Sequence, residues 1–214
     1  EAIAQYEQDV LGEGDSIVDG TESIHITLQP QVAATIMDQY SGKVLALVGG
    51  RGDKVGNRTW NRATDTTRQP GSCFKIIGCY APALDAGGRT LASVEDDAPF
   101  TVGNKTFNNY DFRHRGFINY RTAITNSMNV VTVKALQRIG VDLGYQYAKS
   151  FGFTTLVDDD KNLALALGGL TNGVTNLELT AAYAAIANSG TYTEPIFYTT
   201  IYDHDGNILL DRTE

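Results

Sequence analysis

A proline and a glycine, Pro70 and Gly71, separate a long polar segment from an apolar one. The polar segment, residues 51–68, contains glycine and several charged residues, which is typical of a loop. Proline fits the first turn of a helix because its ring fixes φ near helical values, and glycine fits a preceding turn. The apolar residues that follow recur at helical spacing: Phe74, Ile77, Ala81 and Leu84. The sequence therefore predicts a helix from this turn to Gly87-Gly88, with its first turn presented by a loop.

Runs of β-branched and apolar residues predict two β-hairpins, one on each side of the helical middle of the chain. The first joins residues 32–37 to residues 44–48 through a polar turn. The second joins residues 196–202 to residues 207–210 around Asp205-Gly206, a dipeptide favoured in tight turns. Each hairpin predicts an antiparallel strand pair.

Helical patterns occupy residues 120–126 and 130–139, and a third helix opens at Thr175 and ends near Gly190. Thr175 and Glu178 match a capping box, in which each residue satisfies a free backbone N–H of the helix start. Residues 93–116 show little periodicity, and we expect a long loop there, either functional or disordered.

The chain has 214 residues, of which 42% are hydrophobic, enough for one globular domain with a flanking segment. Its net charge of -8 argues against a nucleic-acid partner, because phosphate binding needs clustered Lys and Arg. No apolar run reaches the roughly 20 residues that span a bilayer, and the N-terminus lacks a signal-peptide pattern. Apolar residues recur at helical spacing in residues 1–12, and several glycines follow. We therefore expect residues 1–30 to form a short helix and a linker. We also expect the sequence to be a segment of a longer protein.

Metal and disulfide patterns are absent from the sequence. Cys73 and Cys79 lie six residues apart in the predicted helix, about 9 Å along its axis, which is too far for a disulfide. Metal-ligand spacing is missing from the three histidines, His25, His114 and His204. We expect residues 158–160, all aspartate, to form a solvated loop and not a cation site. The sequence thus predicts no metal and no cofactor.

The strongest catalytic candidates are Ser72 and Lys75, which match the pattern S-x-x-K at the start of the predicted helix. A spacing of three places both side chains on one helix face. A serine hydroxyl becomes a nucleophile when a base removes its proton, and a lysine with a pKa lowered by burial can be that base. Free N–H groups at the helix start favour developing negative charge. On spacing alone, the alternative is an exposed lysine near a capping serine.

A second candidate pattern is S-x-N at Ser127 and Asn129, between two predicted helices. A loop at this position can present a hydroxyl and an amide to a cleft. The alternative is helix capping, for which both residue types are favoured. The order of the two patterns matters, because S-x-x-K, S-D-N and K-T-G form one penicillin-interactive set.

Together with these patterns, further segments of residues 31–211 resemble the transpeptidase domain of class A (bifunctional) penicillin-binding proteins. Arg-Gln-Pro-Gly-Ser before Phe-Lys is highly specific for that family. The segments that carry the resemblance are Val44–Gly50, Asn61–Thr64, Arg68–Ser72, Phe74-Lys75, Ser127-x-Asn129, Leu165–Gly169, Gly173-Val174, Leu177-Glu178, Ala182–Ala184 and Ala187–Gly190.

The resemblance implies an α+β fold of the serine β-lactamase/D,D-transpeptidase type, with an antiparallel sheet, a helical lobe and the active serine between them. It implies that Ser72 attacks the carbonyl between the two D-alanines of a peptidoglycan stem peptide, with Lys75 as acylation base. Ser127 would relay the proton to the departing D-alanine, and Asn129 would hold the substrate amide. β-Lactams would acylate Ser72, and half of the oxyanion hole would be the Ser72 backbone N–H.

Class A membership also implies a glycosyltransferase domain and a membrane anchor upstream, with this domain on the extracytoplasmic face of the bacterial cell membrane. Two departures from the family pattern matter. No Lys-Thr-Gly occurs in the chain, so we expect residues 31–214 to be a transpeptidase domain truncated before that strand and completed by a companion polypeptide. Cys73 stands where the family often has Thr, and we expect its thiol to be inert packing.

Two other functions remain open. A β-lactamase-type hydrolase needs a carboxylate to activate the deacylating water, yet no Glu lies between Glu95 and Glu178, and Glu178 belongs to the capping box. The second alternative is a non-catalytic penicillin-binding fragment.

Overall fold

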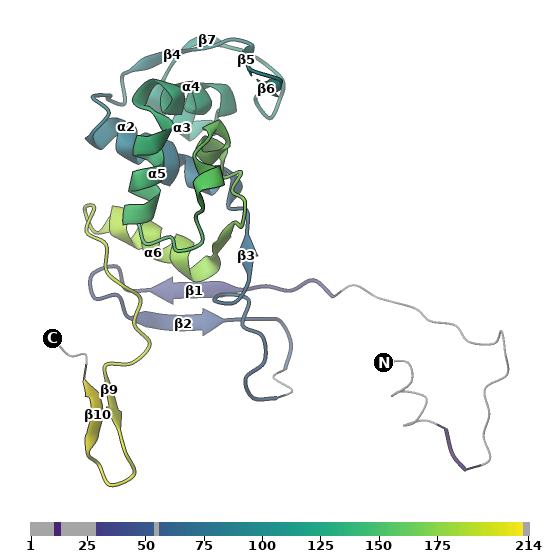
Figure 1. Cartoon of the computed structure of the whole chain (residues 1–214), viewed down its shortest axis with the longest axis vertical. Coiled ribbons are helices and arrows are strands. Elements are labelled where there is room, and N and C mark those ends of the chain that lie inside the picture. The colour runs from purple at the N-terminus through teal and green to yellow at the C-terminus, as the bar shows by residue number, and fades with distance from the viewer. Residues whose placement is uncertain (1–10, 14–28, 54–55, 212–214) are drawn as a thin grey trace. The chain divides into compact units, whose positions relative to one another are not determined.

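The structure is a computed structural model that describes residues 11–13, 29–53 and 56–211. The chain divides into two compact units, Glu1–Pro30 and Gln31–Glu214. The helix predicted in residues 1–12 falls almost wholly outside the described residues. All the elements below belong to the second unit (Figure 1).

The first hairpin is confirmed. Strand β1 (Ala34–Met37) pairs antiparallel with β2 (Val44–Val48), with Ala34 opposite Val48. Helix α6 (Asn176–Ala187) lies along this pair, and Thr35 Oγ1 donates a 2.7 Å hydrogen bond to Asn176 Oδ1 (Figure 1). The hairpin therefore contacts the helical part of the domain through α6.

The predicted helix after Pro70 is present, but its geometry changes along its length. It begins as the 3-10 turn η1 (Gly71–Cys73), continues through Lys75 into the π-helical turn η2 (Ile76–Tyr80) and ends as α2 (Ala81–Asp85). Within the π turn, the N–H of Ala81 bonds to the carbonyl of Ile76, five residues earlier. Pro82, which follows directly, has no N–H to continue an α-helical ladder.

The π turn makes one detail of the predicted helix wrong. Leu84 was predicted to share one helix face with Phe74 and Ile77, which are buried, but it is 37% exposed, whereas Pro82 and Ala83 are buried. A π turn contains more residues than an α turn, so it shifts the phase of the apolar face.

Helices α3 (Tyr120–Thr125) and α4 (Asn129–Ile139) confirm the two predicted helices. Helix α5 (Val141–Ser150) was not predicted; it follows α4 directly after Gly140, which has φ of +90°. These helices and the segment 71–85 enclose the core. Its largest fully buried apolar side chains are Phe74, Ile77, Tyr80, Tyr120, Val130, Val131, Val133, Leu136, Leu165 and Leu170.

The long loop predicted for residues 93–116 is wrong, because most of this segment forms short strands. Strand β4 (Val94–Asp97) pairs with β7 (Gly116–Asn119), and β5 (Phe100–Val102) pairs with β6 (Lys105–Phe107). Tertiary contacts stabilise these three- and four-residue strands, since Arg138 of α4 forms a 2.5 Å ion pair with the buried Glu95 of β4. Strands this short carry no periodicity that a sequence pattern can detect.

The remaining described elements are short strands and helical turns. Strand β3 (Thr67–Arg68) pairs with β8 (Val174–Thr175). The short helices η3 (Asp158–Asp160) and η4 (Leu163–Leu167) precede β8. The last hairpin, β9 (Thr200–Tyr202) with β10 (Ile208–Asp211), is confirmed. The capping box that opens α6 is confirmed too.

The expectation of a solvated loop at residues 158–160 is wrong for Asp160. This carboxylate is 1% exposed and accepts hydrogen bonds from the backbone N–H groups of Val157 and Thr171. It therefore orders the segment between α5 and β8.

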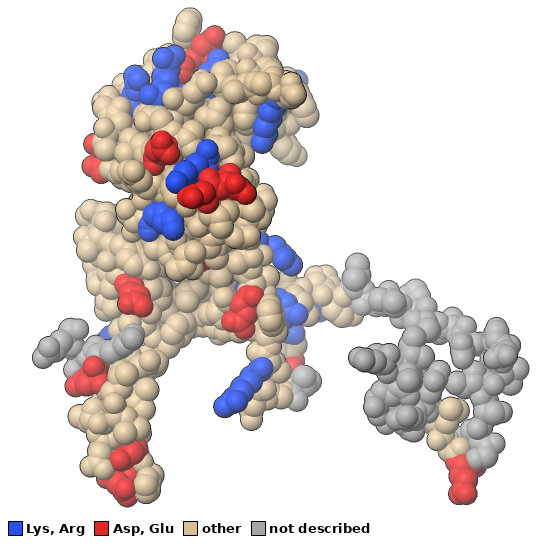
Figure 2. All heavy atoms as spheres, in the orientation of Figure 1, with Lys and Arg blue, Asp and Glu red and all other residues tan. Residues whose placement is uncertain are grey.

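Charged side chains are mixed over the face seen in Figure 2, where Lys and Arg alternate with Asp and Glu. That face thus offers no continuous patch of one charge. No helix among the described residues is long and apolar enough to cross a membrane.

Candidate active site

Ser72 lies at the exposed start of the helical segment 71–85, in the 3-10 turn η1. Gly71 has φ of +55°, a left-handed conformation that glycine adopts without strain. The next residue, Cys73, is exposed, so the prediction that its thiol packs in the interior is wrong. Its backbone carbonyl accepts a 2.7 Å hydrogen bond from the hydroxyl of Tyr183 on α6. This hydrogen bond connects the turn that carries Ser72 to α6.

A glycine-rich segment holds the same turn from another side. Gly168 has φ of +71°, and a Cβ atom there would lie 2.4 Å from the carbonyl oxygen of Gly71. Gln69 Nε2 donates a 2.7 Å hydrogen bond to the carbonyl of Leu170. This close approach explains why the Leu165–Gly169 segment ends in glycine: a side chain at Gly168 would push the Ser72 turn away.

Lys75 is the buried member of the predicted site, with 4% of its surface exposed. Its Nζ donates to Asn129 Oδ1 at 2.6 Å, to the Ser127 carbonyl at 2.5 Å and to Ser127 Oγ at 3.0 Å. Burial lowers the pKa of Lys75 from 10.5 to about 8. The structure therefore brings together three of the four predicted residues, and Ser72 lies three residues before Lys75 in the same helical segment.

Ser127 and Asn129 flank the break between α3 and α4, where the sequence pattern placed them. Ser127 has φ of +50°, an unusual value for a residue with a side chain. Backbone bonds hold it there: Ser127 N–H donates to Ile124, and Met128 N–H donates to Ala123. With Met128 buried, Ser127 and Asn129 both reach Lys75.

A buried polar cluster fixes the segment 71–85 against α4, and so fixes Lys75 relative to Ser127. The Tyr80 hydroxyl lies 2.9 Å from Thr132 Oγ1, which donates a 2.5 Å hydrogen bond to the Met128 carbonyl. Cys79 Sγ donates to the Thr132 carbonyl at 3.2 Å. Burial raises the pKa of the Cys79 thiol, so it stays protonated and able to donate.

Asn109 was not predicted as a site residue. It lies in residues 93–116, which were predicted to be a loop, and it contacts the start of α4. It is 4% exposed, and its Oδ1 accepts a 2.9 Å hydrogen bond from the backbone N–H of Asn129. The neighbouring Asn108 carbonyl accepts from Asn129 Nδ2 at 2.9 Å. Nothing in the local sequence distinguishes this Asn-Asn pair from an ordinary turn.

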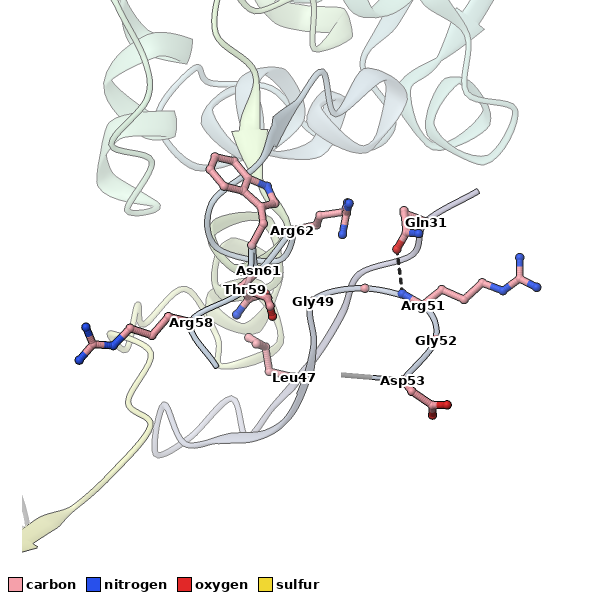
Figure 3. Close-up of a pocket in the computed structure, with 12 residues that line it drawn as sticks. Gln31, Leu47, Gly49, Arg51, Gly52, Asp53, Arg58, Thr59, Asn61 and Arg62 are labelled. Carbon is pink, nitrogen blue, oxygen red and sulfur yellow. Dashed lines mark hydrogen bonds between the residues drawn. The ribbon is translucent and has the colours of Figure 1, made fainter. Parts of the chain in front are cut away.

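A separate cavity of about 660 Å³ lies beyond the end of β2 (Figure 3). Three arginines line it, but Figure 3 shows Arg51 and Arg58 pointing to opposite sides, so these two charges do not converge on one point. Trp60 also lines it and donates a 2.7 Å hydrogen bond to Thr66. None of the four predicted catalytic residues lines this cavity. Groups of His, Cys, Asp and Glu able to hold a metal ion are absent from the described part of the chain.

A comparison with known protein families identifies the type of domain that contains Ser72, Lys75, Ser127 and Asn129. The family described as "Penicillin binding protein transpeptidase domain" matches residues 32–213. The chain belongs to the penicillin-binding protein transpeptidase family. The resemblance to the class A transpeptidase domain is thereby confirmed, and so is the α+β fold of that type.

Relatives in this family include penicillin-binding protein 1A of Clostridium botulinum (strain Langeland / NCTC 10281 / Type F), 36% identical over 196 residues. That match covers 86% of this chain and 24% of the relative. Penicillin-binding protein 1F of Bacillus subtilis (strain 168) is 39% identical over 182 residues, 85% of this chain and 25% of the relative. The chain thus spans about a quarter of the length of these penicillin-binding proteins.

Solved penicillin-binding proteins share the fold. Penicillin-binding protein 1A from Haemophilus influenzae matches with a TM-score of 0.73 and 30% identity, covering 85% of this chain and 27% of that one. PonA1 from Mycobacterium tuberculosis in complex with penicillin V matches with a TM-score of 0.75 and 24% identity, covering 98% and 53%.

Proposed function

We propose that the protein is a serine D,D-transpeptidase that cross-links peptidoglycan stem peptides ending in D-Ala-D-Ala, and that β-lactams acylate it at Ser72. The observation that carries this proposal is the hydrogen-bonded group of Lys75, Ser127 and Asn129, in which Lys75 follows the exposed Ser72 by three residues in one helical segment. In this group the pKa of Lys75, about 8, leaves a fraction of the lysine neutral near pH 7, and this fraction can accept a proton.

In the acylation step, Ser72 Oγ attacks the carbonyl carbon between the two D-alanines. Neutral Lys75 takes the hydroxyl proton, and negative charge develops on the carbonyl oxygen, which the Ser72 backbone N–H stabilises. Ser127, within hydrogen-bond distance of Lys75 Nζ, relays the proton to the amine of the departing D-alanine as the peptide bond breaks. An amine of a neighbouring stem then attacks the acyl-enzyme, and the proton path runs in reverse.

Asn129 is assigned to holding the amide of the substrate. Its Oδ1 accepts from Lys75, and one Nδ2 hydrogen goes to the Asn108 carbonyl, which leaves its second Nδ2 hydrogen for a substrate carbonyl. The side chain can therefore position Lys75 and the substrate together.

The β-lactamase-type alternative is less well supported, because Glu178 has a structural role. Its Oε1 accepts from the N–H and hydroxyl of Thr154, and its Oε2 accepts from the N–H and hydroxyl of Thr175. Four hydrogen bonds leave this carboxylate little capacity to activate a water.

We further propose that residues 31–214 belong to the transpeptidase domain and that residues 1–30 form a flanking linker. The partition at Pro30 and the family match over residues 32–213 support the boundaries. The proposed substrate places the domain on the extracytoplasmic face of the cell membrane, where peptidoglycan lies.

Fluorescent penicillin tests the proposal in the full-length protein. We expect covalent labelling of the wild type, loss of labelling in S72A and nearly unchanged labelling in the matched neighbour C73T. Slow release of the label indicates a transpeptidase, and fast release indicates a β-lactamase. Labelling that persists in S72A would mean that Ser72 is not the nucleophile.

A further inference from the structure

The start of helix α4 is capped by a residue from a distant strand segment. The N-cap residue Met128 makes no side-chain capping bond, as expected for an apolar residue. Asn109 takes over that role: its Oδ1 accepts from the N–H of Asn129 at 2.9 Å and from the N–H of Val130 at 3.2 Å. Asn109 therefore fixes the helix end that carries Asn129.

The orientation of the Asn109 amide is itself determined by buried partners. Its Nδ2 donates to Asp97 Oδ1 at 2.7 Å and to the Arg113 carbonyl at 2.8 Å. Asp97 is fully buried, and its Oδ2 accepts from the backbone N–H of Arg115 at 2.9 Å. A flipped amide would point its NH2 group at two N–H donors, so only one orientation satisfies all partners.

The same segment also holds the Asn129 side chain. The Asn108 carbonyl accepts from Asn129 Nδ2, which directs Asn129 Oδ1 toward Lys75 Nζ. One chain of hydrogen bonds thus runs from buried Asp97 through Asn109 to the backbone of Asn129, and from the Asn129 side chain to Lys75.

We infer that Asn109, held by Asp97, is a positioning residue that sets the placement of Asn129 and, through it, of Lys75 for acylation. This inference rests on the proposed transpeptidase function. Asn109 is buried and acts through Asn129, not by touching substrate. The titratable or charged groups that face Asp97 are His114, whose Nδ1 lies 3.7 Å from its Oδ1, and Arg115.

The first test compares N109A with N104A in the full-length protein. N109A removes the cap, and we expect penicillin acylation to slow by about 10- to 100-fold, because small misplacements of catalytic groups cost that much. N104A changes an exposed side chain in the turn between β5 and β6 that makes none of the hydrogen bonds described above, so it should acylate at nearly the wild-type rate. Amide exchange at Asn129 and Val130 should become faster in N109A alone.

The second test exchanges the carboxylate of Asp97 and the amide of Asn109, and it remains informative if N109A fails to fold. N109D places a carboxylate against Asp97, and we expect acylation to slow because two like charges then meet in a buried site. The double variant D97N/N109D restores an amide-to-carboxylate hydrogen bond in the opposite direction but not the bond to the Arg113 carbonyl, so acylation should recover in part, by about tenfold over N109D. A general packing role for Asn109 predicts no such recovery.

Wild-type acylation rates in N109A and N109D would overturn the inference, as would a double variant no faster than N109D. Absence of labelling in the wild type would instead count against the proposed function. In that case, amide exchange at Asn129 and Val130 decides the inference, because unchanged exchange in N109A contradicts it.

Discussion

The ammonium group of Lys75 donates a 2.6 Å hydrogen bond to Oδ1 of Asn129, a residue 54 positions later in the chain. This bond joins the helical segment that carries Ser72 to the start of α4. Two of the three acceptors around Lys75 Nζ belong to Ser127, so the lysine is enclosed by one S-x-N loop.

Replacing Lys75 with arginine should abolish most of the acylation. Arginine keeps the positive charge but cannot lose its proton near neutral pH, so it cannot act as base. We expect penicillin acylation to slow by about 10²- to 10⁴-fold, the usual contribution of general-base catalysis. The matched control is K161R, because Lys161 is half exposed and pairs with Asp158 at the surface. Equal rates in K75R and K161R would remove Lys75 from the mechanism.

Acylation by the wild type should depend on pH through Lys75. Burial lowers its pKa to about 8, so the neutral base form appears as pH rises through about 8. We expect the acylation rate constant to rise about tenfold per pH unit below this value and to level off above it. Stopped-flow measurements between pH 5.5 and 9.5, on the order of ten points, give the profile. A rate that falls as pH rises through 8 contradicts the assignment of Lys75 as base.

The same lowered pKa affects stability. Below about 8 the lysine is charged in both the folded and the unfolded chain, and the folded state bears the full cost of burying that charge. Between about 8 and 10.5 the unfolded chain binds more protons than the folded one, so the contribution of Lys75 to folding stability rises with pH. Urea unfolding of the wild type and K75M at pH 7 and pH 9.5 should show a difference that shifts in favour of the wild type at the higher pH.

Replacing Gly168 with alanine should disturb the Ser72 turn. The new methyl group would lie 2.4 Å from the Gly71 carbonyl oxygen, and the backbone there has φ of +71°. We expect a loss of about 2–4 kcal/mol in the free energy of unfolding, together with slower acylation. Gly206 is the control, because it has φ of +85° but nothing within 4 Å of its Cβ position. G206A should cost only about 1 kcal/mol and leave acylation unchanged; similar effects in both variants would mean that the close approach is unimportant.

Replacing Glu178 with glutamine tests its role as a structural group. Burial raises the pKa of Glu178, but hydrogen bonds from Thr154 and Thr175 outweigh burial and leave the pKa below its ordinary 4.5. The carboxylate therefore stabilises the fold above pH 4.5, and this contribution is lost as pH falls through the lowered pKa. At pH 7 we expect E178Q to lose about 1–2 kcal/mol of unfolding free energy, whereas E194Q, at an exposed position, changes little. Release of bound penicillin should be equally slow in wild type and E178Q, unless the protein is a β-lactamase.

Local sequence patterns correctly predicted the elements that depend on interactions between residues a few positions apart in the chain. The two hairpins, the Thr175–Glu178 capping box and helices α3 and α4 are confirmed, because turn residues, caps and periodicity act over a few positions. The run from Arg68 to Lys75 likewise indicated the family, because its residue types follow one another in a specific order within eight positions.

The sequence by itself thus determined the family, the α+β fold and the identity of the four candidate residues, since these depend on short patterns of residue types. Only the tertiary structure decided that Lys75 is buried against Ser127 and Asn129, that Asn109 caps α4 and that Cys73 is exposed. The physical reason is range: the hydrogen bonds of Lys75 cross 52 and 54 residues, and those of Asn109 cross 12 and 20. Contacts over such distances depend on how helices and strands pack together, which no local spacing records.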